Sequence, residues 1–324
     1  MAGPLNTAGE ADAAAIALLE TELFSEAAYR RYGVEFRGFD QLRLMARLER
    51  YAAQNGLKGI SSLQGAMLRH PELARKAFRF ASESASAFFT RPDAFMALRC
   101  AVLPLLRSAT WPVVWLAECS DPAFLHQFVV MLEEEGVLGK TQLFVTNANE
   151  DVLSVAAAAR IGLDAMPARE ALHAKGGGKA PLSSFCEQDA DGFFLRAELA
   201  RRVVWSQHDL AADASFNECH LVVCQRPLPD FDPGLQKRAL GLFSESLCNF
   251  GILQLEAPAG NPRHELMRDF ACLLGEQGIY KRLPEEPRLH AVLPSALRVS
   301  ARLSPASSGR ILRRRIMAEE IIYS

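Results

Sequence analysis

Four short apolar runs, separated by stretches with helical periodicity, constrain the fold of this chain most strongly. They are Val113–Ala117, Leu143–Thr146, Leu221–Cys224 and Ile252–Leu255. Continuous apolar runs of this length are typical of strands that are buried on both faces of a sheet. Strands that alternate with helices favour a parallel sheet covered on both sides, so we predict an α/β, doubly wound domain of the Rossmann type.

Local signals between and after these runs predict helices and a small β subdomain. Helical patterns span Asp151–Ile161, which ends at Gly162, and Pro233–Leu247, which follows Asp232 as N-cap. The run Phe193-Phe194-Leu195 after Asp191-Gly192 predicts a hairpin. The glycine-rich stretch 174–180 (AKGGGKA) predicts a flexible connection.

The first part of the chain has helical periodicity and no strand signal. We expect a frayed tail over residues 1–14 and then four helices: one from about residue 15 to Gly33, one over Leu42–Ala52, one over Ser61–Arg69, and one opened by Pro71. The predicted domains are therefore a helical domain at 15–85, the α/β domain at 86–284, and a C-terminal tail at 285–324 with one terminal helix around Arg310–Ile322.

Composition narrows the functional classes. A formal net charge of −2 argues against nucleic-acid binding driven by bulk charge. No apolar run reaches the roughly 20 residues that span a bilayer, and the N-terminus lacks the features of a signal peptide, so we expect no membrane insertion and a cytoplasmic location. The seven cysteines and seven histidines are scattered, which favours free thiols and predicts no metal site.

The turn after the first strand is the most informative segment, and it lies in WLAECSDPAFLHQF, Trp115–Phe128. In α/β folds, a nucleotide-like cofactor binds at such a turn, where glycines let the backbone approach the ligand. This turn contains no glycine; it has Glu118, Asp121, Pro122 and Phe124 instead. It is therefore either a cofactor loop with unusual chemistry or one that has lost its cofactor.

The order of these features resembles one known family. A helical domain, a linker (FFTRPDAFMALRCAVLP) and an α/β domain ending in HDLAADASFNECHLVVCQRPLPDFDPGLQKRALGLFSESL are similar to the CheR family of chemoreceptor methyltransferases. The resemblance covers roughly residues 16–283 and is strongest over Arg201–Leu247. It implies methyl transfer from S-adenosylmethionine to glutamate side chains of a chemoreceptor that docks through the helical domain.

The residues that would carry this chemistry depart from the family pattern. The family motif G-C-S-T-G-E-E corresponds to Glu118–Phe124 (ECSDPAF), where both glycines and both glutamates are missing. A ribose-binding Asp corresponds to Asn147, which can still accept one hydrogen bond. The motif C-R-N-V-L-I-Y-F corresponds to Cys224–Phe231, where Arg226 either substitutes for a lost arginine or is a surface residue without a ligand.

The linker and a further motif depart as well. The family motif T-E-M-F-R corresponds to residues 86–90, which keep a hydroxyl at Ser86, and the arginine moves to Arg91. In the motif H-N-L, Asp209 replaces Asn, and we expect His208 to be structural. If a rebuilt pocket exists, the candidate cofactor-binding residues are Glu118, Asp121, Asn147 and Asp209. The candidates for handling the substrate are Ser86, Arg91 and Arg226.

Three hypotheses follow for the function. In the first, the chain is a degenerate, non-catalytic CheR-type homologue with a regulatory or docking role in chemotaxis-like signalling, and its binding of S-adenosylmethionine is weak or lost. In the second, it is an active protein-glutamate O-methyltransferase with a rebuilt pocket. In the third, the pocket is kept and binds a different ligand, which the sequence does not name. A basic helical face would dock an acidic receptor helix; the alternative is a solvated surface balanced by Glu26, Glu35 and Glu49. The arginines of that face are Arg30, Arg31, Arg43, Arg47 and Arg50.

Overall fold

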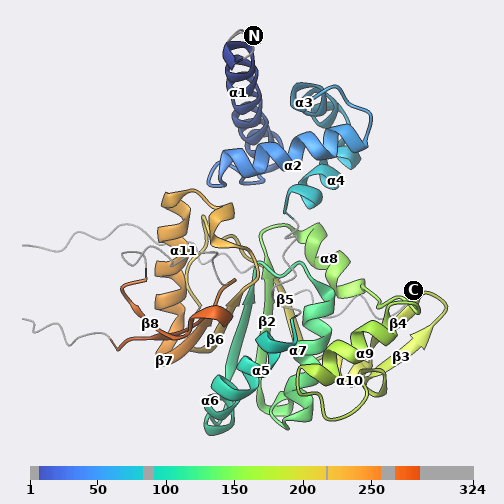
Figure 1. Ribbon diagram of the computed structural model, residues 1–324, viewed down its shortest axis with the longest axis vertical. Helices are drawn as coiled ribbons and strands as arrows, with labels where there is room; N and C mark the ends of the chain where they lie inside the picture. The colour runs from blue at the N-terminus through green and yellow to red at the C-terminus, as the bar shows by residue number, and fades with distance from the viewer. Residues whose placement is uncertain (1–6, 83–90, 217, 257–266, 285–324) are drawn as a thin grey trace, which may run out of the picture. The chain divides into compact units, whose positions relative to one another are not determined.

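The structure is a computed structural model, and it describes residues 7–82, 91–216, 218–256 and 267–284 (Figure 1). The described residues up to Leu283 belong to one compact unit by their internal contacts. The predicted boundary near residue 85 and the predicted helix at Arg310–Ile322 lie outside the described residues, so both remain predictions.

Four helices at the N-terminal end share one apolar core. They are α1 (Thr7–Tyr32), α2 (Gln41–Gln54), α3 (Ile60–Arg69) and α4 (Pro71–Ser82). Phe24, Leu48 and Met67 are fully buried between them. The helix α2 begins at Asp40, whose carboxylate accepts a hydrogen bond from the Arg43 N–H at 2.9 Å.

The expected tail at residues 1–14 is wrong from residue 7 onward, because α1 already begins at Thr7. This segment is rich in alanine, which is the strongest helix former but contributes no apolar periodicity. A pattern based on large apolar residues therefore starts the helix too late. Its predicted end is confirmed, since Gly33 follows the last helical residue with φ of 72°.

A seven-stranded sheet forms the centre of the α/β part, in the order β5-β2-β1-β6-β7-β9-β8. Strands β5, β2, β1, β6 and β7 are parallel, whereas β9 and β8 are antiparallel to their neighbours. The strands are β1 (Val113–Ala117), β2 (Gln142–Asn147), β5 (Val203–Gln207), β6 (Cys219–Cys224), β7 (Leu247–Gln254), β8 (Phe270–Leu274) and β9 (Ile279–Arg282). This sheet is mostly parallel and is covered by helices on both faces, which confirms the predicted α/β class.

Alternating side chains of the sheet enter two separate cores. Val114 and Leu116 of β1 pack into one core with α5, α6 and α7, while Trp115 and Ala117 pack into the other with α11. Figure 1 shows α11 on one side of the sheet and α7 on the other. The helices are α5 (Pro92–Ala101), α6 (Leu103–Ser108), α7 (Pro122–Glu134), α8 (Glu150–Ala158), α9 (Met166–Lys175), α10 (Ala197–Ala200) and α11 (Pro233–Ser246), with short 3-10 turns η2 (Leu138–Lys140), η3 (Leu182–Phe185), η4 (Leu228–Asp230) and η5 (Gly275–Gln277).

The prediction of four strands missed three members of the sheet and shifted a fourth. The strand β5 lies at one edge, and its apolar run, Val203–Trp205, is only three residues long and is half-buried or exposed. At the other edge, β8 and β9 are short and antiparallel. The run predicted at Ile252–Leu255 belongs to β7, which begins at Leu247, because its first half is partly exposed and hides the apolar signal.

Local signals elsewhere have mixed outcomes. The hairpin is confirmed as β3 (Cys186–Asp189) paired with β4 (Gly192–Leu195). Asp232 caps α11 as predicted, accepting a hydrogen bond from the Leu235 N–H at 2.7 Å. The helix α8 ends at Ala158, before Gly162.

The stretch 174–180 is not a free connection. Its first two residues belong to α9, and the buried Glu134 carboxylate accepts hydrogen bonds from the Lys179 and Ala180 N–H groups at 2.7 and 3.0 Å. No helix in the described residues is long and apolar enough to cross a membrane.

Candidate functional site

The loop that follows β1 begins at Glu118, which holds a backbone conformation that favours glycine. Its φ is 51°, in the left-handed region. Among the described residues, only Glu218 and Phe250 share a positive φ without being glycine. The loop has therefore kept the turn that a glycine would make, and a carboxylate side chain now projects from it.

The Glu118 carboxylate is used inside the protein. Its Oε2 accepts a hydrogen bond from Nε of Arg226 at 2.8 Å, and the two side chains are only 5% and 1% exposed. Arg226 also donates to the main-chain oxygen of Ser82, and its Nη1 lies 3.7 Å from Oδ2 of Asp230. Its guanidinium lies 5.0 Å from the ring centroid of Phe39. The interpretation of Arg226 as a surface residue is therefore wrong.

Asp121 shapes the start of α7. It is the N-cap of that helix, and its Oδ1 accepts a hydrogen bond from the Ala123 N–H at 2.9 Å. Pro122 occupies the first helical position. The Ser120 N–H is bound by Oε1 of Gln225 at 3.2 Å, so side chains of this protein already satisfy polar groups of the loop.

Asn147, at the end of β2, is fully buried and makes local hydrogen bonds. Its Nδ2 donates to the Cys119 main-chain oxygen at 3.4 Å, and its Oδ1 accepts from the Asn149 N–H at 2.9 Å. Both ends of the amide therefore stabilise the two neighbouring loops. Burial raises the pKa of the Cys119 thiol and raises that of Cys224 to about 12, which disfavours the reactive thiolate.

Phe124, in the first turn of α7, is fully buried. Its ring centroid is 5.5 Å from that of Phe95 and 5.5 Å from that of Phe128. It belongs to the same apolar cluster as Leu116 and Val145 of the two central strands. Phe124 therefore packs among apolar side chains of the core.

The other candidates are dispersed. Asp209 is half-buried and accepts a hydrogen bond from the Ala211 N–H at 2.8 Å, and burial raises its pKa. Nε2 of His208 donates to the Ala214 main-chain oxygen at 2.9 Å, and the ring packs against Trp115. Arg91 lies at the start of α5 and pairs with Asp93. Ser86 lies outside the described residues.

The arginines of the helical part are mostly paired within the chain. Arg47 lies 2.5 Å and Arg43 lies 3.6 Å from the Asp230 carboxylate, and Arg30 lies 2.5 Å from Glu26. Arg50 stacks on the Phe80 ring at 5.1 Å. The expected basic face is therefore compensated, and it differs from a free positive patch.

Several polar groups near the loop were not predicted from the sequence. Gln225 Nε2 and both amide atoms of Gln254 are buried without a hydrogen-bond partner, at the carboxyl ends of β6 and β7. Asp230 was missed as well, although its carboxylate joins arginines from two parts of the chain. The signal that could have found Gln254 is a polar residue inside the otherwise apolar run Ile252–Leu255.

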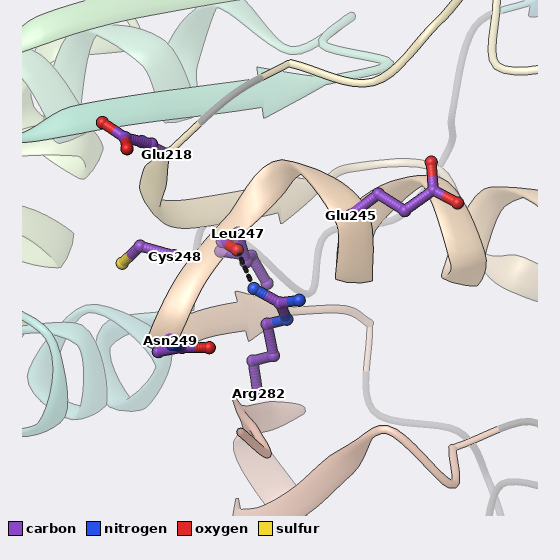
Figure 2. A pocket seen from close by; sticks show the side chains of 6 residues that line it. All are labelled: Glu218, Glu245, Leu247, Cys248, Asn249 and Arg282. Atoms are coloured by element: carbon purple, nitrogen blue, oxygen red, sulfur yellow. Dashed lines mark hydrogen bonds between the residues drawn. The ribbon is translucent and has the colours of Figure 1, made fainter. Parts of the chain in front are cut away.

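A surface hollow of about 650 Å³ lies at the amino ends of β6 and β7, opposite to the ends that carry the loop after β1 (Figure 2). In Figure 2, Arg282 points to the Leu247 main-chain oxygen, to which it donates a hydrogen bond at 2.5 Å. Glu218, Glu245, Cys248 and Asn249 complete the lining. Because cofactors of open α/β sheets bind at the carboxyl ends of the strands, this hollow does not correspond to the loop after β1.

The residues at the loop do not fit the cofactor that the resemblance implies. Its ammonium group needs a free carboxylate and its ribose needs a free polar side chain. Glu118 is engaged by Arg226, Asp121 caps a helix, and Asn147 bonds to its neighbours. No group of three or more His, Cys, Asp or Glu side chains suited to a metal ion occurs in the part of the chain that the structure describes.

Comparison with known proteins places the chain in a family. No family model matches the sequence. Among solved structures, an O-methyltransferase family protein from Burkholderia thailandensis is 14% identical with a TM-score of 0.32, over 83% of this chain and 72% of its own. LepI in complex with SAM is 10% identical with a TM-score of 0.33, over 83% and 59%. Structural similarities of this size carry no functional argument.

The sequence relationship is stronger. A Pseudomonas putida protein named "Putative methyltransferase Cher3" is 32% identical over 266 residues, which are 82% of this chain and 97% of that protein. This chain therefore belongs to the same methyltransferase family as Cher3.

Proposed function

We propose that this chain is a non-catalytic member of its methyltransferase family, with a docking or regulatory role in chemoreceptor-type signalling. The observation that carries the proposal is the buried pair of Glu118 and Arg226, whose atoms lie 2.8 Å apart at the turn where the family cofactor would bind. A buried, paired carboxylate is not available to a ligand ammonium, and separating it from its arginine would leave two charges uncompensated.

Binding of the cofactor and its product tests this proposal directly. In isothermal titration calorimetry, we expect S-adenosylmethionine and S-adenosylhomocysteine to bind more weakly than about 100 μM, which corresponds to less than about 5.5 kcal/mol. The matched variant Glu118→Gly/Arg226→Asn removes both charges and should bind more tightly than the parent. Micromolar binding by the parent chain would refute the proposal.

One observation favours a second candidate, an active protein-glutamate O-methyltransferase with a rebuilt pocket. Gln225 Nε2 and the Gln254 amide are buried without partners at the carboxyl ends of β6 and β7. Buried polar groups normally have a partner, so a bound ligand would satisfy them. If so, transfer of a radioactive methyl group from S-adenosylmethionine to a chemoreceptor fragment should depend on Gln254 and disappear in Gln254→Leu.

We further propose that a chemoreceptor or another signalling protein docks through the helical part. The residues suited to test this are Arg31 and Arg50, whose guanidinium groups lie over the Tyr32 and Phe80 rings at 5.1 Å. Neither has an ion pair within the described residues, so reversing their charge leaves the Asp230 contacts intact. Arg31→Glu/Arg50→Glu should weaken capture by a chemoreceptor cytoplasmic fragment. Capture equal to that of the parent would place the docking surface elsewhere.

A further inference from the structure

A line of charged side chains connects helix α2 to the loop after β1. Arg47 on α2 lies 2.5 Å from Oδ2 of Asp230 in η4. The same oxygen is 3.7 Å from Nη1 of Arg226, whose Nε donates to Glu118 at 2.8 Å. Arg43, one turn before Arg47, lies 3.6 Å from the other oxygen of Asp230. Charges therefore alternate in sign from α2 to the turn that has replaced the family's glycine.

Three of these side chains are almost completely removed from water. Glu118, Arg226 and Asp230 are 5%, 1% and 2% exposed, whereas Arg47 is 16% exposed. A buried charge that loses its partner cannot be stabilised by solvent, so each member depends on the next. The four side chains therefore form one electrostatic unit and are not independent pairs.

Main-chain contacts between the helical part and the α/β part hold Asp230 in place. The Asp40 N–H donates to the Asp230 main-chain oxygen at 2.9 Å, and the Asp232 N–H donates to the Gly38 main-chain oxygen at 2.9 Å. The rings of Phe39 and Phe231 contact edge to face at 5.8 Å. Asp230 can therefore exchange its arginine partners without leaving its position.

We propose that this charge line transmits the state of helix α2 to the loop after β1. An acidic partner that draws Arg47 and Arg43 away leaves the Asp230 carboxylate without an arginine partner from α2. Asp230 then attracts the Arg226 guanidinium, now 3.7 Å away, and weakens its bond to Glu118. The loop loses the contact that closes it. This inference rests on the proposed docking through the helical part, but its test requires no partner.

Amide hydrogen exchange on the full chain tests the coupling. The variant Arg47→Met keeps most of the side chain's apolar length and removes its charge. We expect the amides of Cys119, Ser120, Asp121 and Ala123 to exchange about ten-fold faster or more, which corresponds to about 1.4 kcal/mol of local opening. Arg50→Met is the matched control, because Arg50 lies on the same helix and stacks on Phe80 without joining the line. In this control, the amides of the loop after β1 should exchange at the same rate as in the parent.

Unchanged exchange at residues 119–123 in a folded Arg47→Met protein would overturn the proposal. If that variant does not fold, Arg43→Met provides the same test with a milder change, because Arg43 is 55% exposed. It should accelerate loop exchange about two- to three-fold, and no acceleration would also overturn the proposal. Titration of S-adenosylhomocysteine reports separately on the proposed loss of the cofactor, so either proposal can fail while the other stands.

Discussion

Restoring glycine at position 118 tests whether the loop is closed by its ion pair. Glu118→Gly removes a carboxylate that is 5% exposed and leaves Arg226, 1% exposed, with Asp230 at 3.7 Å as its nearest carboxylate. Removing one partner of a buried pair costs about 3–5 kcal/mol. Glycine also relieves a left-handed backbone conformation, which contributes about 1 kcal/mol in the opposite direction. The expected net loss in the free energy of unfolding is therefore about 2–4 kcal/mol.

Urea denaturation of the two proteins at pH 7 measures this loss as a shift of the midpoint at an unchanged slope. The matched control is Glu218→Gly, because Glu218 has φ of 57° and is exposed. That change relieves similar backbone strain without breaking a buried pair, so its stability should stay within about 1 kcal/mol of the parent. Equal stability of Glu118→Gly and the parent would refute the reasoning, because the pair would then contribute nothing to closing the loop.

The remaining predictions concern the core, a buried histidine and a helix cap. Phe124→Ala should lower the free energy of unfolding by about 3–5 kcal/mol in urea denaturation, whereas Trp111→Ala, at a residue 74% exposed, should change it little. Burial and the nearby Arg169 lower the pKa of His126 from 6.5 to about 4. The unfolded chain therefore binds this proton first as pH falls, and stability that is fully present above about pH 6.5 should decrease by roughly 3 kcal/mol toward pH 4. The same titration of His126→Leu should lack this contribution, and an identical slope in both proteins would contradict the assignment. Asp232→Ala should cost about 1 kcal/mol through the lost N-cap bond to Leu235, measured by thermal unfolding, and a neutral effect would argue against the cap.

Features that depend on neighbouring residues could be predicted from the sequence. The strand Val113–Ala117 was predicted with the bounds that the structure has, because an apolar β-branched run between polar segments is a local signal. The cap at Asp232 and the end of α1 at Gly33 were predicted for the same reason.

Features that depend on distant residues could not be predicted in this way. Strand β5 pairs with β2 at one edge of the sheet, and its apolar run, Val203–Trp205, is only three residues long and partly exposed, so it gives a weak local signal. At the candidate site, the sequence identified Glu118 and Arg226 as unusual, but they are 108 residues apart, and no local pattern predicts that they pair. The partner of a buried charge is decided by which strand ends the topology brings together. The parallel pairing of β1 with β6 places Ala117 beside Cys224 and so brings the residues after each strand to the same edge. The sequence alone determined the four neighbouring strands β2, β1, β6 and β7 and showed that the turn after β1 contains no glycine. The tertiary structure decided what holds that turn, because only the packed sheet places Arg226 where the Glu118 carboxylate needs a counter-charge.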